Sequence, residues 1–231
     1  MNQQVNIEFN MEECCSRAET LFLERAGISG EGEKYENLRR SAWALLEEIL
    51  DRIELRGSFS FYGDCRLSAD DLIVSMGDGA EDVSLKCTAF QQFMPDSIEG
   101  IYAYGLTAGD LPLGDRSITE QLLGDFWGTA FVDAARENLM TEIGKEHPIS
   151  EGFGPGFFGM DPMEISKLKL LVDFSKIGVK INESGMLLPQ KSCSGILFKV
   201  NEKYDSLNEA CEMCSGNRDS CCLCIFSKKG L

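Results

Sequence analysis

Histidine and the common hydrolase motifs are scarce or missing in this sequence of 231 residues. His147 is the sole histidine, and it precedes Pro148 in a charged stretch, so we expect it to be solvated rather than catalytic. A Ser-His-Asp or Cys-His site would depend on that residue alone, and a histidine-rich metal site is excluded. The sequence also lacks a Gly-x-Ser-x-Gly elbow and a Gly-x-x-x-x-Gly-Lys-Ser/Thr phosphate loop. The residues alone do not decide whether the chain is an enzyme.

The sequence also contains few basic residues relative to acidic ones. The 38 acidic residues outnumber the 22 basic ones, which gives a formal net charge of -16. Nucleic acids and anionic lipids require Lys and Arg to displace their counterions, so we expect neither as a partner. No apolar run is long enough to span a bilayer. The N-terminal residues lack the basic start and apolar stretch of a secretory signal, and we therefore expect a cytoplasmic protein.

Two long stretches have the apolar spacing of helices. Residues 11–56 are predicted to be helical, most clearly from Lys34 to Glu54, and Gly57 is expected to end that helix. A second long helix is predicted from Ser117 to Ile143. It carries two apolar stripes, one of which begins with Ile118 and Leu122, so we expect it to be buried over much of its circumference.

The remaining elements are shorter, and together they predict an α+β domain over residues 1–200, followed by a cysteine-rich tail over residues 201–231. A third helix is expected after Asp161, with Asp161 as its N-cap, Pro162 in its first turn and Glu164 completing a capping box. Short apolar runs between turns predict strands at Phe59–Tyr62, Val83–Phe90, Ile98–Tyr104, Ile177–Ile181 and Ser194–Val200.

The glycine-rich loop from Gly152 to Gly159 has two interpretations. It is either a turn that packs its phenylalanines into the core, or a backbone surface that lies close to a flat ligand, since glycine lets the main chain approach. A phosphate site is disfavoured, because the helix that follows already has Asp161 as its cap.

Cysteine is abundant, with ten residues, and five of them lie in the tail. Such clustering in a reducing compartment favours metal or redox chemistry over disulfides. Four thiolates suit zinc and an iron–sulfur cluster equally, and a redox-sensitive tail without metal is the alternative. The candidate ligands are Cys211, Cys214, one of Cys221 or Cys222, and Cys224.

The segment Asn182-Glu-Ser-Gly-Met-Leu-Leu-Pro-Gln-Lys-Ser-Cys-Ser-Gly195, together with Gly154-Pro-Gly-Phe157, resembles the activation domain of cobalamin-dependent methionine synthase. The likeness is strongest with short, free-standing relatives of that domain that carry a cysteine-rich tail. It implies a twisted antiparallel sheet flanked by helices, a groove for S-adenosylmethionine, and a corrinoid-binding protein as partner. The ligand-binding residues that it implies are Asp133, Gly154, Pro155, Gly156, Phe157, Ser194 and Gly195.

Three positions depart from the pattern of that family. Gly152 stands where the family has an arginine for the ligand carboxylate, and Phe157 and Leu197 each stand where it has a tyrosine. The first change removes a charge-assisted contact to S-adenosylmethionine.

Three hypotheses follow for the function. The first is an accessory role in corrinoid-dependent methyl transfer, in which the chain docks a corrinoid protein and presents S-adenosylmethionine for reductive reactivation. The second is a thiolate–metal protein whose iron–sulfur cluster donates electrons to a corrinoid partner. The third is an interaction domain with a structural zinc in its tail.

Overall fold

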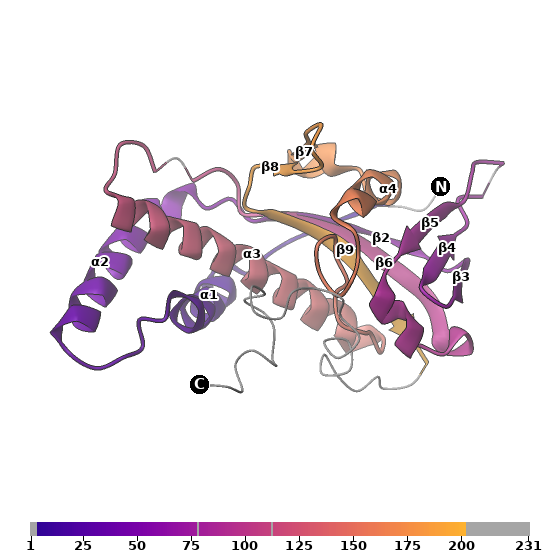
Figure 1. Ribbon diagram of the computed structural model, residues 1–231, viewed down its shortest axis with the longest axis horizontal. Coiled ribbons are helices and arrows are strands. Elements are labelled where there is room, and N and C mark those ends of the chain that lie inside the picture. Colours follow the sequence, from indigo (N-terminus) through magenta and orange to yellow (C-terminus); the bar gives the residue numbers. More distant parts are fainter. Residues whose placement is uncertain (1–3, 78, 112, 202–231) are drawn as a thin grey trace.

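The main sheet is four-stranded and antiparallel, and its strand order is β1-β2-β6-β9. The computed structural model describes residues 4–77, 79–111 and 113–201 of the chain. The long strands of this sheet twist along their length (Figure 1). The four strands are β1 (Val5–Ile7), β2 (Arg56–Tyr62), β6 (Ile98–Thr107) and β9 (Ser192–Val200).

Two smaller antiparallel sheets accompany the main one. The first has the order β3-β4-β5, follows directly on β2 and lies at one end of the main sheet (Figure 1). The second is the β7-β8 hairpin. Their strands are β3 (Cys65–Ser68), β4 (Asp71–Val74), β5 (Val83–Lys86), β7 (Lys180–Ile181) and β8 (Leu187–Leu188).

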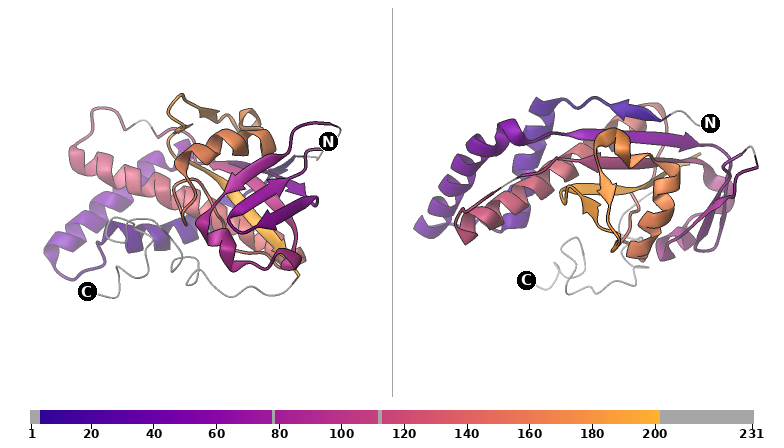
Figure 2. Two further views of the ribbon diagram at one scale, coloured as in Figure 1. Left: turned by 45° about the vertical axis from the view of Figure 1, so that its right-hand side comes forward. Right: turned by 90° about the horizontal axis from the view of Figure 1, so that it is seen from above.

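The described helices are α1 (Met11–Ala26), α2 (Glu33–Ile49), α3 (Ile118–Glu146) and α4 (Ile165–Leu171). The helices α3 and α4 pack against opposite faces of the main sheet, and α1 and α2 pack on α3 beyond one end of the sheet (Figure 2), which confirms the predicted α+β class with an antiparallel sheet flanked by helices. Five 3₁₀ turns are also described, at Leu50–Arg52, Thr88–Gln92, Pro95–Ser97, Pro162–Glu164 and Phe174–Ile177. Within the described ranges, no helix combines the length and the apolar character that crossing a bilayer requires.

Strand β6 is buried on both faces because the sheet has a layer on each side. Ile101 and Ala103 belong to the core shared with α4 and the three-stranded sheet. Tyr102 and Tyr104 alternate with them and pack with residues of α3. Alternating side chains of one strand therefore join two separate cores, and the strand holds both layers in place.

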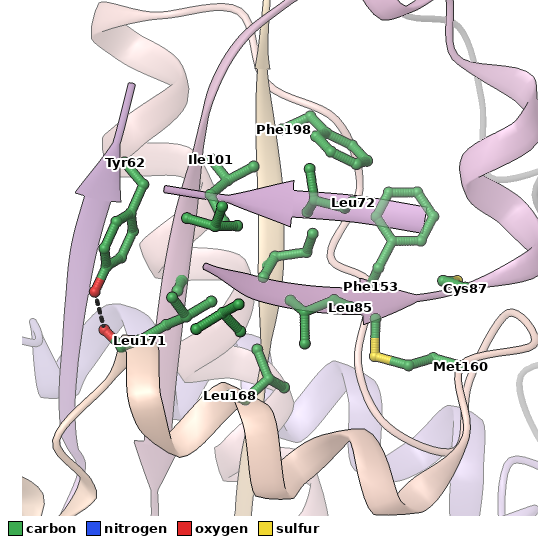
Figure 3. Close-up of a cluster of buried hydrophobic side chains, with 14 of the residues drawn as sticks. Tyr62, Leu72, Leu85, Cys87, Ile101, Phe153, Met160, Leu168, Leu171 and Phe198 are labelled. Carbon is green, nitrogen blue, oxygen red and sulfur yellow. Dashed lines mark hydrogen bonds between the residues drawn. The ribbon is translucent and has the colours of Figure 1, made fainter. Parts of the chain in front are cut away.

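The hydrophobic core next to α4 packs the glycine-rich loop together with α4 and the strands (Figure 3). Leu168 and Leu171 of α4 pack in one cluster with Leu72 of β4 and with Phe153 of the glycine-rich loop. The hydroxyl of Tyr62 donates a hydrogen bond of 2.7 Å to the carbonyl oxygen of Leu171. The glycine-rich loop is thus anchored in the same core as α4.

The first three helices lie together at one end of the molecule (Figure 1) and enclose a cluster of aromatic side chains. The rings of Phe22 on α1 and Trp127 on α3 are stacked with their centroids 3.8 Å apart, and Trp43 of α2 meets both edge-on. The indole nitrogen of Trp127 donates to the carbonyl oxygen of Ala42 at 3.0 Å. This packing fixes α1 and α2 onto the N-terminal half of α3.

The prediction of one helical region over residues 11–56 is wrong in detail. Gly27 ends α1 in the left-handed conformation with φ 62°, and α2 starts only after Gly32, whose φ is 108°. Both values suit glycine, so the chain breaks there. Gly57 does not end the helix but lies inside β2, where a Cβ would meet the Leu106 side chain at 2.5 Å.

Other predicted elements are confirmed with shifted bounds or corrected. The long helix begins after Ser117, which caps it, but Ile118 and Leu122 are exposed. Asp161 accepts from the Met163 amide, whereas the Glu164 carboxylate accepts from the Lys86 amide at 3.1 Å and does not close a capping box. The run expected as a strand over 83–90 ends at residue 86 and continues as a 3₁₀ turn, and the one over 177–181 is a strand only at residues 180–181.

The aromatic unit gives a first prediction. Trp127→Ala should lower the free energy of unfolding by about 3–5 kcal/mol, because it removes a fully buried ring and its hydrogen bond. Urea denaturation measures the change. Ile118→Ala, on the same helix but 86% exposed, should stay within about 0.5 kcal/mol of the parent chain. Equal losses in the two variants would contradict this packing.

Candidate functional site

The glycine-rich loop lies along the edge of the main sheet. Phe153 and Ile196 form an isolated antiparallel bridge, with amide-to-carbonyl distances of 2.9 and 2.8 Å. The amide of Ser150 donates to the Phe198 carbonyl at 3.0 Å, and its hydroxyl accepts from the Phe198 amide at 2.9 Å. The loop thus extends the sheet beside β9, which is the last strand in the sheet order.

Two glycines make this close approach possible. A Cβ at Gly195 would lie 2.3 Å from the carbonyl oxygen of Phe153, and one at Gly154 would lie 2.6 Å from the carbonyl oxygen of Ser194. Both contacts are with backbone atoms and are far shorter than real Cβ contacts. These glycines are therefore required by the packing of the loop on the strand, before any ligand is considered.

The turn that follows confirms the packing interpretation for two of the three phenylalanines of the loop. Phe153 and Phe158 are buried in the core, as the packing interpretation expects. Phe157 is 44% exposed and lies at a cleft. Gly156 has φ +87°, and no atom lies within 4 Å of a Cβ built there, so its role is conformational.

A cleft of about 210 Å³ lies between the loop, β9 and the two helices α1 and α3. The loop, α3 and the start of β9 each contribute several of its lining residues, and α1 contributes Arg25. Its lining comprises Arg25, Tyr104, Thr129, Val132, Asp133, Arg136, Gly152, Gly154, Phe157, Phe158 and residues 190–194.

The charged side chains that line the cleft are Arg25 of α1, Asp133 and Arg136 of α3, and Lys191 just before β9, and none belongs to the glycine-rich loop. Asp133 is largely buried and forms an ion pair with Arg25 of α1. Its other carboxylate oxygen is 3.6 Å from a terminal guanidinium nitrogen of Arg136, one turn further along α3. The carboxylate thus lies between two guanidinium groups and remains an acceptor at the cleft wall.

Two further polar groups line the cleft, the Cys193 thiol and the Tyr104 hydroxyl, and both are protonated at neutral pH. Burial raises the pKa of the Cys193 thiol to about 12; Arg136 lowers that pKa and Asp133 raises it by smaller amounts. Burial also raises the pKa of Tyr104 well above its usual range. Neither group supplies an anionic nucleophile at neutral pH.

Gly152 lies directly beside the hydroxyl of Tyr104. A Cβ at residue 152 would be 2.8 Å from that oxygen and 3.5 Å from a methyl carbon of Leu197. Leu197 is fully buried and does not line the cleft. No cation therefore comes from the loop or from this part of the strand.

Lys191 separates the cleft from a second hollow of about 430 Å³, which it also lines together with Gln190. The Lys191 ammonium contacts a carboxylate oxygen of Asp125 at 2.5 Å and the Thr129 hydroxyl at 3.1 Å. Its aliphatic stem lies on α3 at Gly128, where a Cβ would meet it at 2.8 Å. The two hollows are therefore neighbours along α3.

Four of the residues that the sequence suggested for a ligand line this one cleft. They are Asp133, Gly154, Phe157 and Ser194. Pro155 and Gly156 lie in the turn and Gly195 lies beneath the loop, and none of the three belongs to the lining. Glu183 lies elsewhere, at a hollow of about 580 Å³ beside α4.

Sequence reasoning missed the cations and the polar groups of the cleft floor. Arg136 follows Asp133 by three residues on a predicted helix, so helical spacing could have placed both on one face. Arg25, Tyr104 and Cys193 gave no such signal, because the pairing of α1 with α3 and of β6 with β9 brings them to the cleft.

The predicted metal ligands Cys211, Cys214, Cys221, Cys222 and Cys224 lie outside the described residues. Among the residues that the structure does describe, no group of three or more His, Cys, Asp or Glu side chains is placed to hold a metal ion. The five cysteines in that part of the chain, Cys14, Cys15, Cys65, Cys87 and Cys193, are free thiols.

Comparison with known proteins identifies the fold. A scan against models of protein families gave no match, and neither did a search of curated proteins. Among solved structures, the chain is similar to the crystal structure of the MetH reactivation domain bound to AdoHcy, with a TM-score of 0.66. The match covers 89% of this chain and 81% of that chain at 15% sequence identity. The chain therefore has a fold like that of the reactivation domain.

The contact between loop and strand gives a second prediction. Gly195→Ala should lower the free energy of unfolding by about 1–3 kcal/mol, because the added methyl group would meet a backbone oxygen. Gly144→Ala is the control: it lies on an exposed part of α3 with only a 3.9 Å contact, and it should be neutral or stabilising. Chemical denaturation of both variants measures the difference, and an unchanged Gly195→Ala chain would refute the close approach.

Proposed function

We propose that the chain is an accessory domain of corrinoid-dependent methyl transfer in the cytoplasm. It binds an S-adenosyl ligand in the cleft and docks against a corrinoid-carrying protein for reductive reactivation. One observation carries the proposal: Asp133, Gly154, Phe157 and Ser194, which are far apart in sequence, line one cleft. The fold of the MetH reactivation domain, which was solved with AdoHcy bound, supports the same assignment.

The residue types in the cleft fit an S-adenosyl group. Asp133 offers a carboxylate to ammonium or hydroxyl groups, and Arg136 has a buried Nε without an acceptor among the described residues. Phe157 presents an aromatic ring that is 44% exposed, which suits a flat base. A bound S-adenosylmethionine would contribute the sulfonium methyl group as donor.

The size of the groove also fits if both of its parts are used. Pockets for small ligands usually measure about 300–1,000 Å³, and the cleft alone has about 210 Å³. The adjoining hollow of about 430 Å³ shares Gln190 and Lys191 with it. An elongated ligand would therefore extend past Lys191 into the second hollow.

The contribution of the chain to the reaction is positioning. Cys193 and Tyr104 are protonated at neutral pH, and the cleft lining contains no histidine. The loop and α3 would fix the orientation of the ligand, with its reactive end toward the partner. Such a role requires no acid–base pair of the chain itself.

Ligand binding gives the third prediction. S-adenosylhomocysteine should bind to the full chain in isothermal titration calorimetry, and Phe157→Ala should weaken binding about tenfold, because a base stacked on an aromatic ring loses that contact. Met94→Ala, which removes a 72% exposed side chain outside the cleft lining, should bind as tightly as the parent chain.

Two results together would contradict the proposal. One is the absence of any heat of binding for S-adenosylhomocysteine and S-adenosylmethionine. The other is the absence of a complex with a corrinoid-bearing protein in analytical ultracentrifugation.

A second function is favoured by the cysteine cluster of the tail, where five cysteines lie within fourteen residues from Cys211 to Cys224. We propose that these thiolates hold a metal, either an iron–sulfur cluster that donates electrons to the corrinoid partner or a structural zinc. This role is compatible with ligand binding in the cleft, because the two use different residues.

Metal content gives the fourth prediction. Protein purified without oxygen should contain iron with a visible absorption band or, alternatively, stoichiometric zinc. The double change Cys211→Ser and Cys214→Ser should abolish that metal, because two of four ligands are lost. Cys65→Ser, which changes a free thiol outside the tail cluster, should retain the metal. Metal-free parent protein would overturn this assignment.

A further inference from the structure

The cleft carries an excess of positive charge in an acidic protein. Its charged lining residues are Arg25, Asp133, Arg136 and Lys191, and Lys191 is already paired with Asp125 outside the lining. Two guanidinium groups then face the single carboxylate of Asp133. The chain as a whole has a formal charge of -16, so this local excess sets the cleft apart from the average surface.

The two arginines are not equivalent. Arg25 is engaged in a close ion pair with Asp133. Arg136 lies 3.6 Å from the same carboxylate, and its Nε is buried without a hydrogen-bond acceptor among the described residues. A buried N–H without an acceptor is unfavourable, and a guanidinium presents its N–H groups as a planar fork that matches a carboxylate. Arg136 therefore has donor capacity left for an anion in the cleft.

We propose that Arg136 holds the carboxylate of a ligand that bears an α-amino acid group. This inference rests on the proposed function, because it assigns the charged end of the S-adenosyl ligand to one residue. The hydroxyl of Tyr104 lies next to the guanidinium and remains a neutral donor. Asp133 stands one turn before Arg136 on α3, so an ammonium group and a carboxylate group would find opposite charges side by side.

The test is a thermodynamic cycle in which the carboxylate of the ligand and the guanidinium of Arg136 are removed separately and together, and the binding affinities are compared. Calorimetry compares S-adenosylhomocysteine with its decarboxylated analogue, which keeps the adenosine and the ammonium group. The parent chain should prefer the carboxylate-bearing ligand by about tenfold to a hundredfold. Arg136→Gln should bind both within about twofold, because it has no charged fork. Arg40→Gln, on an exposed part of α2, should keep the full preference.

If the parent chain binds neither ligand, the proposed function and this inference are both wrong. If it binds and Arg136→Gln keeps the preference, the inference alone is overturned. If Arg25→Gln abolishes the preference instead, the anion belongs to Arg25 and the inference is again wrong. Arg136→Lys replaces the glutamine variant in the test if that variant does not fold. Lysine keeps the positive charge but lacks the planar guanidinium, so this variant should lose part of the preference for the carboxylate-bearing ligand.

Discussion

The backbone pairing of Phe153 with Ile196 is the contact on which the site depends. It places the glycine-rich loop beside β9, and it can form because Gly154 and Gly195 present no Cβ to the facing backbone. Phe153 is buried in the core of α4, so the same residue anchors the loop on both sides. The groove wall is therefore a consequence of strand extension and core packing.

The second constraint comes from the helices. The stacked rings of Phe22 and Trp127 hold α1 against α3, and the ion pair of Arg25 with Asp133 lies further along the same helix pair. The aromatic unit thus sets the position of one cation of the cleft, while α3 itself provides Asp133 and Arg136. A site built from a loop, a strand and two helices requires both cores to be intact.

Local patterns predicted the parts of the fold that depend on local spacing. The long helix, the main strands and the irregular loop were recognisable, since periodicity and caps belong to neighbouring residues. The break between α1 and α2 was missed, although Gly27 and Gly32 mark it. The short strands β1, β3 and β4 were not recognised either. Arg25 was beyond prediction, because it reaches the cleft only through the pairing of α1 with α3.

Hydrogen–deuterium exchange with and without S-adenosylhomocysteine tests the central claim most directly, because it reports where the ligand lies. The account predicts slower amide exchange in residues 152–158 and 192–194 and in the facing part of α3, with no change around residues 181–185. Protection centred on residues 181–185, at the hollow beside α4, would contradict it. So would saturating ligand that leaves every amide unchanged.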